Sequence, residues 1–424
     1  MKNFIKSSKT WMFALLCALF FSIGIKAEAT PGTVTNVTQI GANSSTVQVE
    51  WTPTTVGTPK LYQLKVYENK ACTGSPYLTS DEIIGSQGVV RNLSAGKSYY
   101  LQVVAIGEDK MEGTPSAAIE VVTSPTTKIT NLKQGKLAAK KISLSWAAAS
   151  GANCYNVGYK KYNGTTETEY KETTTASCSI SASADTRYIV TVCPMRKSST
   201  GYVASGDETL VKSAFMYTTP KKVTKLKLYS TGGPKRSTKL AIFSAKLSNA
   251  ADGYQYELRG YNNKKITTRT VGLNATTTTN TLIEFQKGLK AGEFMRIRIR
   301  PYVYWNGQKK YATKWSDYVW FAPTPKTVKA DISPSKKVED GLIISWSKIK
   351  GANNYSVYVS RDAKSGYKKV ATTTSTKYNL RTFNGSQLTT GTYYYYIVAN
   401  KKFGGKTYKS DDSWYFSKSI KVTY

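Results

Sequence analysis

Hydrophobic and polar residues alternate in short segments along most of the chain, and these segments recur at a nearly constant interval. An aromatic residue closes such a segment at Trp51, Trp146, Phe243 and Trp346, so the successive intervals are 95, 97 and 103 residues. Alternation with a period of two predicts strands with one buried face, and self-similarity at a fixed interval indicates an array of like units. The pattern therefore predicts an all-β chain of four tandem units with almost no helix.

A second mark follows each of these aromatics. A Leu is followed three residues later by Gly in three units, at Leu93, Leu289 and Leu388, and the second unit has a degenerate version that begins at Ala182. Six residues after each of these positions come Tyr99, Tyr188, Met295 and Tyr394. Between the two marks, period-two segments that begin at Tyr155, Tyr254 and Tyr355 predict another strand with one face in the core.

Both marks resemble those of fibronectin type III domains, and the resemblance covers almost all of the chain after residue 30. In that family a Trp of strand B fills the core of a two-sheet sandwich, and a Tyr near the start of strand F returns its hydroxyl to the backbone upstream. The resemblance assigns Trp51, Trp146 and Trp346 to the first role and Tyr99, Tyr188 and Tyr394 to the second. Phe243 and Met295 replace them in the third unit, whose corner lacks the hydroxyl. The style of the repeats looks like that of secreted bacterial proteins.

The first 29 residues have the pattern of a secretory signal peptide. Three lysines precede an apolar run from Trp11 to Ile25, and Ala27-Glu28-Ala29 supplies small residues at a cleavage spacing. The run has 15 residues, which is short for a membrane anchor. We expect no membrane span after cleavage and a location outside the cell, either free or held non-covalently at a wall.

Prolines mark the unit boundaries, because proline suits the first residue of a strand or a link between domains. Pro31, Pro125, Pro220 and Pro325 open the four units. The predicted domains are residues 30–127, 128–220, 221–325 and 326–424. These junctions leave few spare residues, so the array is expected to bend little.

Charge is concentrated in the second half of the chain. The domains carry net charges of −2, +6, +15 and +12 in order, within a total of +34. Such an excess attracts polyanions in a salt-dependent way. Outside a cell an anionic wall polymer or an acidic polysaccharide is the expected partner, and nucleic acid is disfavoured. The alternative is that the lysines keep strand edges soluble.

The sharpest candidate for such a contact is the alternating segment that contains Arg296, Arg298 and Arg300. Met295, Ile297 and Ile299 are expected to face the core, which leaves a row of guanidinium groups on the outer face. Guanidinium groups suit forked contacts with phosphate, sulfate or carboxylate. The alternative is that Glu257 and nearby Tyr rings neutralise or stack on the row. The aromatic-rich stretch from Tyr302 to Phe321 is expected to form a hairpin around Asn306-Gly307.

The sequence lacks several of the residue patterns that enzymes use for catalysis. The chain has no histidine, which removes His-activated nucleophiles and His metal sites. Asp411-Asp412 and Glu167-x-Glu169 are interpreted as turn and surface-strand residues. No enzymatic activity and no cofactor are expected. Cys154 and Cys193 are predicted on the outer face of neighbouring strands, and the sequence leaves open whether they form a disulfide.

The sequence therefore favours a secreted, non-enzymatic spacer or adhesion protein with a basic C-terminal half. Two alternatives remain: an array of carbohydrate-binding modules that use exposed aromatics, and a purely structural rod.

Overall fold

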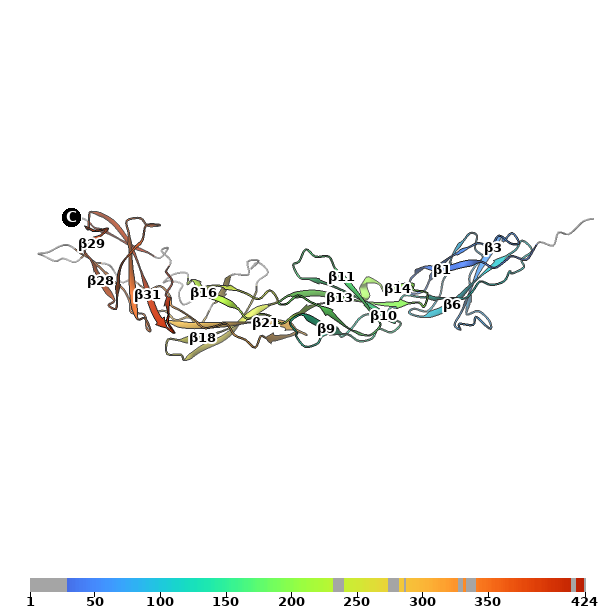
Figure 1. The fold of residues 1–424 in the computed structure, drawn as a ribbon, viewed down its shortest axis with the longest axis horizontal. Helices are drawn as coiled ribbons and strands as arrows, with labels where there is room; N and C mark the ends of the chain where they lie inside the picture. Colours follow the sequence, from blue (N-terminus) through green and yellow to red (C-terminus); the bar gives the residue numbers. More distant parts are fainter. Residues whose placement is uncertain are drawn as a thin grey trace, which may run out of the picture.

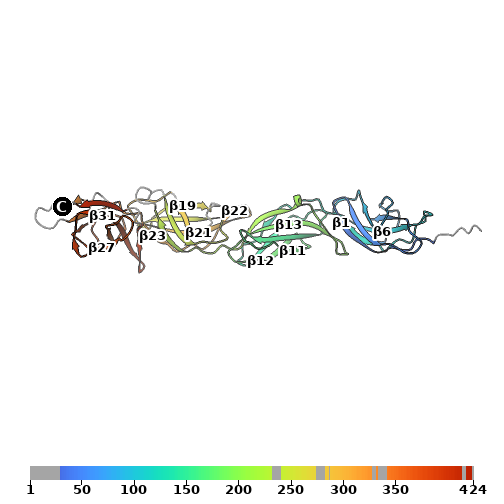
Figure 2. The same ribbon diagram turned by 90° about the horizontal axis from the view of Figure 1, so that it is seen from above.

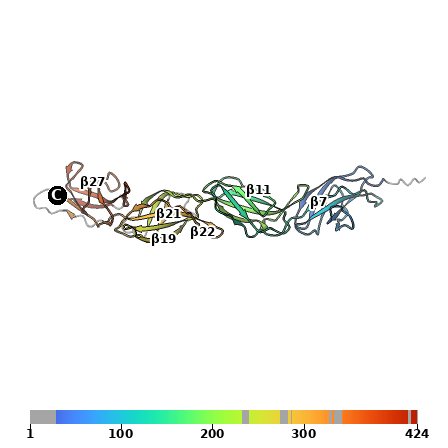
Figure 3. The ribbon, with the colours of Figure 1, turned by 60° about the horizontal axis from the view of Figure 1, so that its bottom comes forward.

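The computed structural model describes residues 29–231, 240–273, 282–285, 287–326, 331–332, 341–412 and 417–422. Residues 1–28 of the predicted signal peptide lie outside the described residues. Four β-sandwiches follow one another along one long axis (Figure 1). The turned views show the same end-to-end order (Figures 2 and 3). Within the described part of the chain, helix is limited to a 3-10 turn, η1 (Glu208–Leu210), which confirms the prediction of an almost helix-free fold.

The first sandwich packs a three-stranded sheet against a four-stranded sheet, and all neighbouring strands are antiparallel. The smaller sheet has the order β1 (Thr35–Ala42), β2 (Val47–Thr52), β5 (Gln87–Val90). The larger has the order β4 (Leu78–Thr79), β3 (Leu61–Tyr67), β6 (Ser98–Ile106), β7 (Ile119–Val122).

The second and third sandwiches repeat this plan with one extra strand in the larger sheet. In the second, the smaller sheet contains β12 (Ser177–Ser181), β9 (Lys141–Ser145) and β8 (Lys133–Gln134). The larger sheet contains β11 (Glu169–Thr173), β10 (Cys154–Lys161), β13 (Arg187–Lys197), β14 (Val203–Ser205) and β15 (Lys212–Tyr217). In the third, the smaller sheet contains β16 (Thr224–Ser230), β17 (Ala241–Lys246) and β20 (Leu282–Phe285). The larger sheet contains β19 (Lys265–Gly272), β18 (Gly253–Gly260), β21 (Met295–Trp305), β22 (Gln308–Tyr311) and β23 (Val319–Phe321).

The fourth sandwich keeps the same order and adds a small hairpin. Its smaller sheet is β24 (Asp331–Ile332), β25 (Leu342–Ser345) and β28 (Lys377–Leu380), and its larger sheet is β27 (Lys368–Thr373), β26 (Asn354–Ser360), β31 (Gly391–Phe403), β32 (Lys406–Lys409) and β33 (Lys418–Val422). The hairpin pairs β29 (Thr382–Phe383) with β30 (Ser386–Gln387). The four sandwiches are called the first to fourth domains below; the residue boundaries between them stay predictions.

The repeated aromatics lie in the cores, as predicted. Trp51, Trp146, Phe243 and Trp346 are all buried. Each Trp contacts a Tyr ring of the next strand, with centroids 5.3 Å apart for Trp51 and Tyr62, 5.2 Å for Trp146 and Tyr155, and 5.4 Å for Trp346 and Tyr355. Truncating a buried aromatic of this kind to Ala costs about 3–5 kcal/mol, so these positions anchor their domains.

The corner tyrosines are confirmed in the first two domains and shifted in the fourth. The Tyr99 hydroxyl accepts from the Ser94 amide at 3.0 Å, and the Tyr188 hydroxyl accepts from the Ser183 amide at 2.8 Å. In the fourth domain the acceptor is Tyr393, bonded to the Thr389 amide at 2.9 Å, so the assignment of Tyr394 is wrong. The fourth corner is one residue tighter, and strand alternation then turns Tyr394 to the outer face.

Met295 takes the corner position of the third domain. Its sulfur lies 3.3 Å from the Lys290 amide nitrogen, in the place that a Tyr hydroxyl occupies elsewhere. The thioether is a weak acceptor, so this corner keeps the backbone turn with a weaker hydrogen bond.

All four described cysteines are free thiols. Cys154 pairs with Met195 and Cys193 pairs with Asn156 across β10 and β13, so the two cysteines are diagonal neighbours. Burial raises the pKa of both thiols, which makes them poor nucleophiles at neutral pH.

The joint between the first and second domains brings two backbones into contact. A Cβ atom on Gly96, which lies at the corner before β6, would be 2.5 Å from the Gly151 Cα in the loop between β9 and β10. Arg196 of β13 crosses the same joint and donates to Ser98 Oγ at 3.0 Å and to the Gly151 carbonyl at 3.1 Å. The joint is therefore closely packed.

The joint between the second and third domains uses the same two regions. Asp185 occupies the corner position before β13 with a φ of 57°, and its buried carboxylate accepts from the Ser248 hydroxyl and the Asn249 amide in the loop between β17 and β18. Arg187 pairs with Asp252 at 3.2 Å. Asn306 of the β21–β22 hairpin exchanges two hydrogen bonds of 2.8 Å with the Gln134 backbone.

The joint between the third and fourth domains follows this plan again. The Lys350 amide, in the loop between β25 and β26, donates to the Gly292 carbonyl at 2.8 Å, and its own carbonyl accepts from the Phe294 amide at 2.9 Å. Asp411 is buried and accepts from the Thr231 amide at 2.6 Å. Asp411, interpreted from the sequence as a turn residue, lies in the loop after β32, and it is buried because it accepts hydrogen bonds from Ser230 and Thr231 of the neighbouring domain.

Candidate polyanion-binding site

The arginine row lies on the outer face of the larger sheet of the third domain. Arg296, Arg298 and Arg300 are partly exposed, and they alternate along β21 with core residues Met295, Ile297 and Ile299. The predicted orientation of the row is confirmed. Because β21 lies between β18 and the pair β22 and β23, the row is carried by an interior strand and held in a fixed plane.

Aromatic rings from the segment 311–320 stack between the guanidinium groups. Arg298 and Arg300 share Trp315, each at 4.6 Å from the ring centroid. Arg296 and Arg298 share Tyr318, at 4.1 and 4.8 Å. Arg300 also lies 5.0 Å from Tyr311. We call this alternating stack of three arginines with Tyr311, Trp315 and Tyr318 the Arg–aromatic ladder.

Ser316 holds the aromatic segment against β21. Its amide donates to the Ile299 carbonyl at 2.8 Å, and its hydroxyl accepts from the Ile299 amide at 2.9 Å. These two bonds extend the hydrogen bonding along β21 beyond its partner strand β22. Trp315 and Tyr318, on either side of this anchor, are thereby placed over the arginine row. The Asn306-Gly307 hairpin that leads into the segment forms as predicted, between β21 and β22.

The stack continues across the joint into the fourth domain. Trp320 of β23 lies 5.6 Å from the Arg296 guanidinium carbon and 4.5 Å from the Lys401 ammonium nitrogen. Lys401 belongs to β31 of the fourth domain, and burial lowers its pKa. Cations and rings thus alternate from one domain into the next.

Among the described residues, one carboxylate contacts the ladder. Glu257 of β18 is buried; it accepts from Arg259 at 2.8 Å and from the Tyr318 hydroxyl, and it lies 3.2 Å from Arg298. Burial opposes its ionisation, but hydrogen bonds from Arg259, Tyr318 and Arg298 outweigh burial and lower its pKa to about 2. Glu257 is therefore ionised at neutral pH.

The end arginines of the row have polar partners of their own. Arg300 Nε donates to Gln255 at 2.8 Å, and Arg296 donates to Asn263. The partners that the sequence suggested as alternatives, Glu257 and Tyr rings, do contact the row. The Nε atoms of Arg296 and Arg298 are buried and have no hydrogen-bond partner among the described residues. Polyanion binding by the row stays a prediction.

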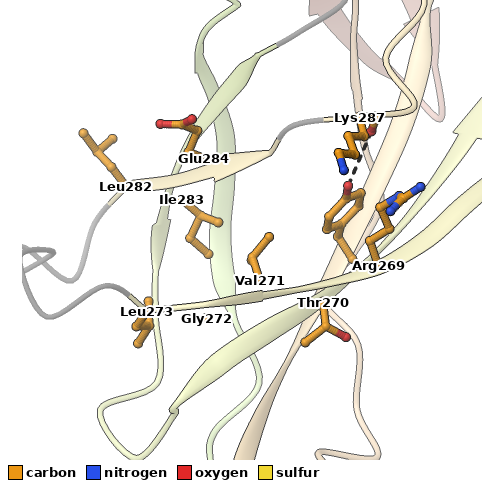
Figure 4. A pocket seen from close by; sticks show the side chains of 10 residues that line it. Arg269, Thr270, Val271, Gly272, Leu273, Leu282, Ile283, Glu284 and Lys287 are labelled. Carbon is orange, nitrogen blue, oxygen red and sulfur yellow. Dashed lines mark hydrogen bonds between the residues drawn. The ribbon is translucent and has the colours of Figure 1, made fainter.

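A separate pocket of about 450 Å³ opens between β19 and β20 of the same domain (Figure 4). Val271 and Ile283 lie between the two strands, and the Tyr256 hydroxyl donates to the Lys287 carbonyl at 3.4 Å. Its described lining contains one carboxylate, Glu284. A glycosidase site needs two carboxyl groups, so this lining does not form one.

The described residues contain neither a metal-binding cluster nor a candidate membrane-spanning helix. Within that part of the chain, His, Cys, Asp and Glu nowhere gather in threes that could hold a metal ion. In the same residues, no helix has the length and apolar character that crossing a bilayer requires.

Similarity to known proteins is limited to solved structures. No protein-family model and no curated protein matches the chain. Among solved structures, domains FN1–FN3 of chicken CNTN1 cover 68% of this chain and 98% of their own, at 16% identity and a TM-score of 0.26. A segment of two fibronectin type III domains from chicken tenascin covers 43% of this chain and 98% of its own, at 14% identity and a TM-score of 0.23. The FN5 domain of Drosophila Lar covers 22% of this chain and 98% of its own, at 25% identity and a TM-score of 0.20.

The repeated two-sheet architecture defines the fold class of the chain. Each unit packs a three-stranded sheet against a larger antiparallel sheet, which is the two-sheet sandwich architecture of fibronectin type III domains. The chain is a tandem array of fibronectin type III-like β-sandwiches.

Proposed function

We propose that this protein is a secreted, non-enzymatic spacer or adhesion protein whose basic half associates with anionic polymers outside the cell. The observation that carries the spacer role is the repeated joint. In all three joints the corner before the long strand of one domain (β6, β13 or β21) meets the loop that follows the central strand of the next domain's smaller sheet (β9, β17 or β25). The contacts join Gly96 with Gly151, Asp185 with Asn249, and Gly292 with Lys350. Buried hydrogen bonds and close backbone contacts of this kind resist bending.

A stiff rod keeps a ligand that is bound at one end at a fixed distance from the other end. Flexible linkers would allow the domains to collapse on one another. Small-angle X-ray scattering tests the proposal directly. We expect one extended conformation whose scattering profile is independent of salt; a broad distribution of compact and extended shapes would contradict the spacer role.

The adhesion role rests on charge and on the ladder. The third and fourth domains carry +15 and +12, and the ladder presents three guanidinium groups against a single buried carboxylate, Glu257. Such a face attracts phosphate, sulfate or carboxylate groups. The competing carbohydrate-binding role is less well supported, because Trp315 and Tyr318 already contact guanidinium groups and are not free platforms for sugar rings.

Affinity for a carboxylate polymer such as polygalacturonate, measured over a range of salt concentrations with the full-length mature chain, tests the adhesion role. We expect the dissociation constant to rise steeply with salt. Replacing Arg296, Arg298 and Arg300 together by Ser should flatten this dependence, and replacing them by Lys should preserve most of it while weakening affinity through the lost forks. Salt-independent binding would favour the aromatic, carbohydrate-binding alternative.

A further inference from the structure

A pocket of about 500 Å³ lies beside the joint between the third and fourth domains. It is lined by side chains from the turn between β18 and β19, from the corner before β21, and from the loop between β25 and β26 of the next domain. Its lining includes an amide, four lysines and a carboxylate: Asn262, Lys264, Lys265, Lys290, Lys350 and Glu293. Both domains contribute, so the pocket exists only when the joint is formed.

Backbone hydrogen bonds fix the walls of this pocket. Lys350 is tied to the third domain by bonds of 2.8 Å to the Gly292 carbonyl and 2.9 Å from the Phe294 amide. The opposite wall is a closed turn, in which the Gly260 amide donates to the Lys264 carbonyl at 2.9 Å and the Lys264 amide to Asn262 Oδ1 at 3.1 Å. A ligand would meet a preformed site.

The pocket carries an uncompensated positive charge. Four ammonium groups line it against one carboxylate, and Lys290 lies 3.9 Å from Glu293. Lys264, Lys265 and Lys350 form no ion pair with any described residue of the chain. A site of this composition attracts an anion.

Glu293 adds a requirement that charge alone does not explain. It is 8% exposed, and its Oε1 atom has no hydrogen-bond partner among the described residues. The same oxygen lies 3.9 Å from Lys290 Nζ, beyond hydrogen-bond distance, and a buried carboxylate oxygen without a donor is costly. A ligand that donates a hydroxyl to this oxygen would relieve the cost, and a ligand without hydroxyl groups would leave the oxygen without a donor.

We infer that this lysine pocket is a binding site for a polyhydroxylated anion, such as the uronate unit of an acidic polysaccharide. The lysines would hold the carboxylate of the sugar, and Glu293 would accept from a sugar hydroxyl. This inference rests on the proposed association with anionic polymers and adds the chemical class of the polymer. Asn263, in the same turn, accepts from Arg296, so the pocket adjoins the end of the Arg–aromatic ladder.

The first test compares two triple variants of the full-length mature chain with equal loss of charge. The site variant is Lys264→Gln, Lys265→Gln, Lys350→Gln. The control is Lys225→Gln, Lys227→Gln, Lys246→Gln, which removes exposed lysines from β16 and β17 in the other sheet of the third domain. We expect the site variant to bind polygalacturonate at least about tenfold more weakly, and the control to lose only about twofold.

The outcomes separate the inference from the proposed function. Equal weakening of both variants would overturn the pocket and leave general charge attraction intact. Failure of the unaltered protein to bind polygalacturonate or polyphosphate at low salt would refute the proposed function, and the inference with it. Circular dichroism melts confirm that each variant is folded.

Glu293→Gln tests the hydroxyl requirement. Removing the negative charge should strengthen binding of polyphosphate, which has no hydroxyl groups along its chain, by about threefold. The same change should weaken polygalacturonate by about threefold, because the charge-assisted acceptor is lost. Movement of both affinities in one direction would show that Glu293 only sets the local charge, and would overturn the assignment of a polyhydroxylated ligand.

Discussion

Gly96 and Gly151 come from neighbouring domains and meet backbone to backbone. A Cβ on Gly96 would lie 2.5 Å from Gly151 Cα, and a Cβ on Gly151 would lie 2.9 Å from Gly96 Cα. Both residues also have positive φ, 62° and 82°, a region that side chains disfavour. Glycine is therefore required at both positions for two reasons: the positive φ of each turn and the close approach of the two backbones at the joint.

Gly96→Ala should open this joint. The methyl group clashes with rigid backbone, so we expect the first domain to tilt away from the second and the scattering profile to change. Gly74→Ala is the matched control, since Gly74 has a φ of 83° and nothing within 4 Å of the added methyl. It should lose only the cost of the turn, about 1 kcal/mol. Identical scattering for both variants would show that the joint does not depend on this contact.

Trp315→Ala should destabilise the third domain. Arg298 and Arg300 would both lose a ring 4.6 Å away, at about 0.5–2 kcal/mol for each contact. Thermal unfolding should shift down by several degrees. Tyr229→Ala in the same domain removes an aromatic that is 65% exposed and serves as the control. Equal shifts for the two variants would show that the ladder stabilises nothing.

The stability of the third domain should fall in acid through Glu257. The pKa of this carboxyl is lowered from 4.5 to about 2 in the fold, so its contribution is complete above about pH 4.5 and is lost as pH falls toward 2. The difference corresponds to about 3 kcal/mol. Chemical denaturation at several pH values should show this slope in the unaltered protein. Glu257→Gln should be less stable at pH 7 and should have a flatter profile below pH 4.5; an unchanged profile would refute the assignment.

Tyr393→Phe and Tyr394→Phe should differ in the fourth domain. The Tyr393 hydroxyl accepts from the Thr389 amide at 2.9 Å, and its loss should cost about 1 kcal/mol. Tyr394 faces outward, so its hydroxyl should be dispensable. Urea unfolding midpoints measure both; a larger loss for Tyr394→Phe would restore the original assignment of the corner.

Local patterns were sufficient for the architecture. Strand alternation is a property of neighbouring residues, so the core positions of Trp51, Phe243 and Ile297 and the outward direction of Arg298 could be predicted from spacing. The exception is Tyr394, because a one-residue change in a corner moves every later side chain to the other face.

The sequence by itself determined the number of domains, their all-β fold, the outward row of arginines and the placement of charge, because each follows from local periodicity or composition. Only the tertiary structure decided how the domains join and what surrounds the row. Asp411 is buried by Thr231, 180 residues away, and Glu293 shares a pocket with Lys350 of the next domain. Contacts between distant segments depend on how separate sandwiches pack, and no local pattern contains that information.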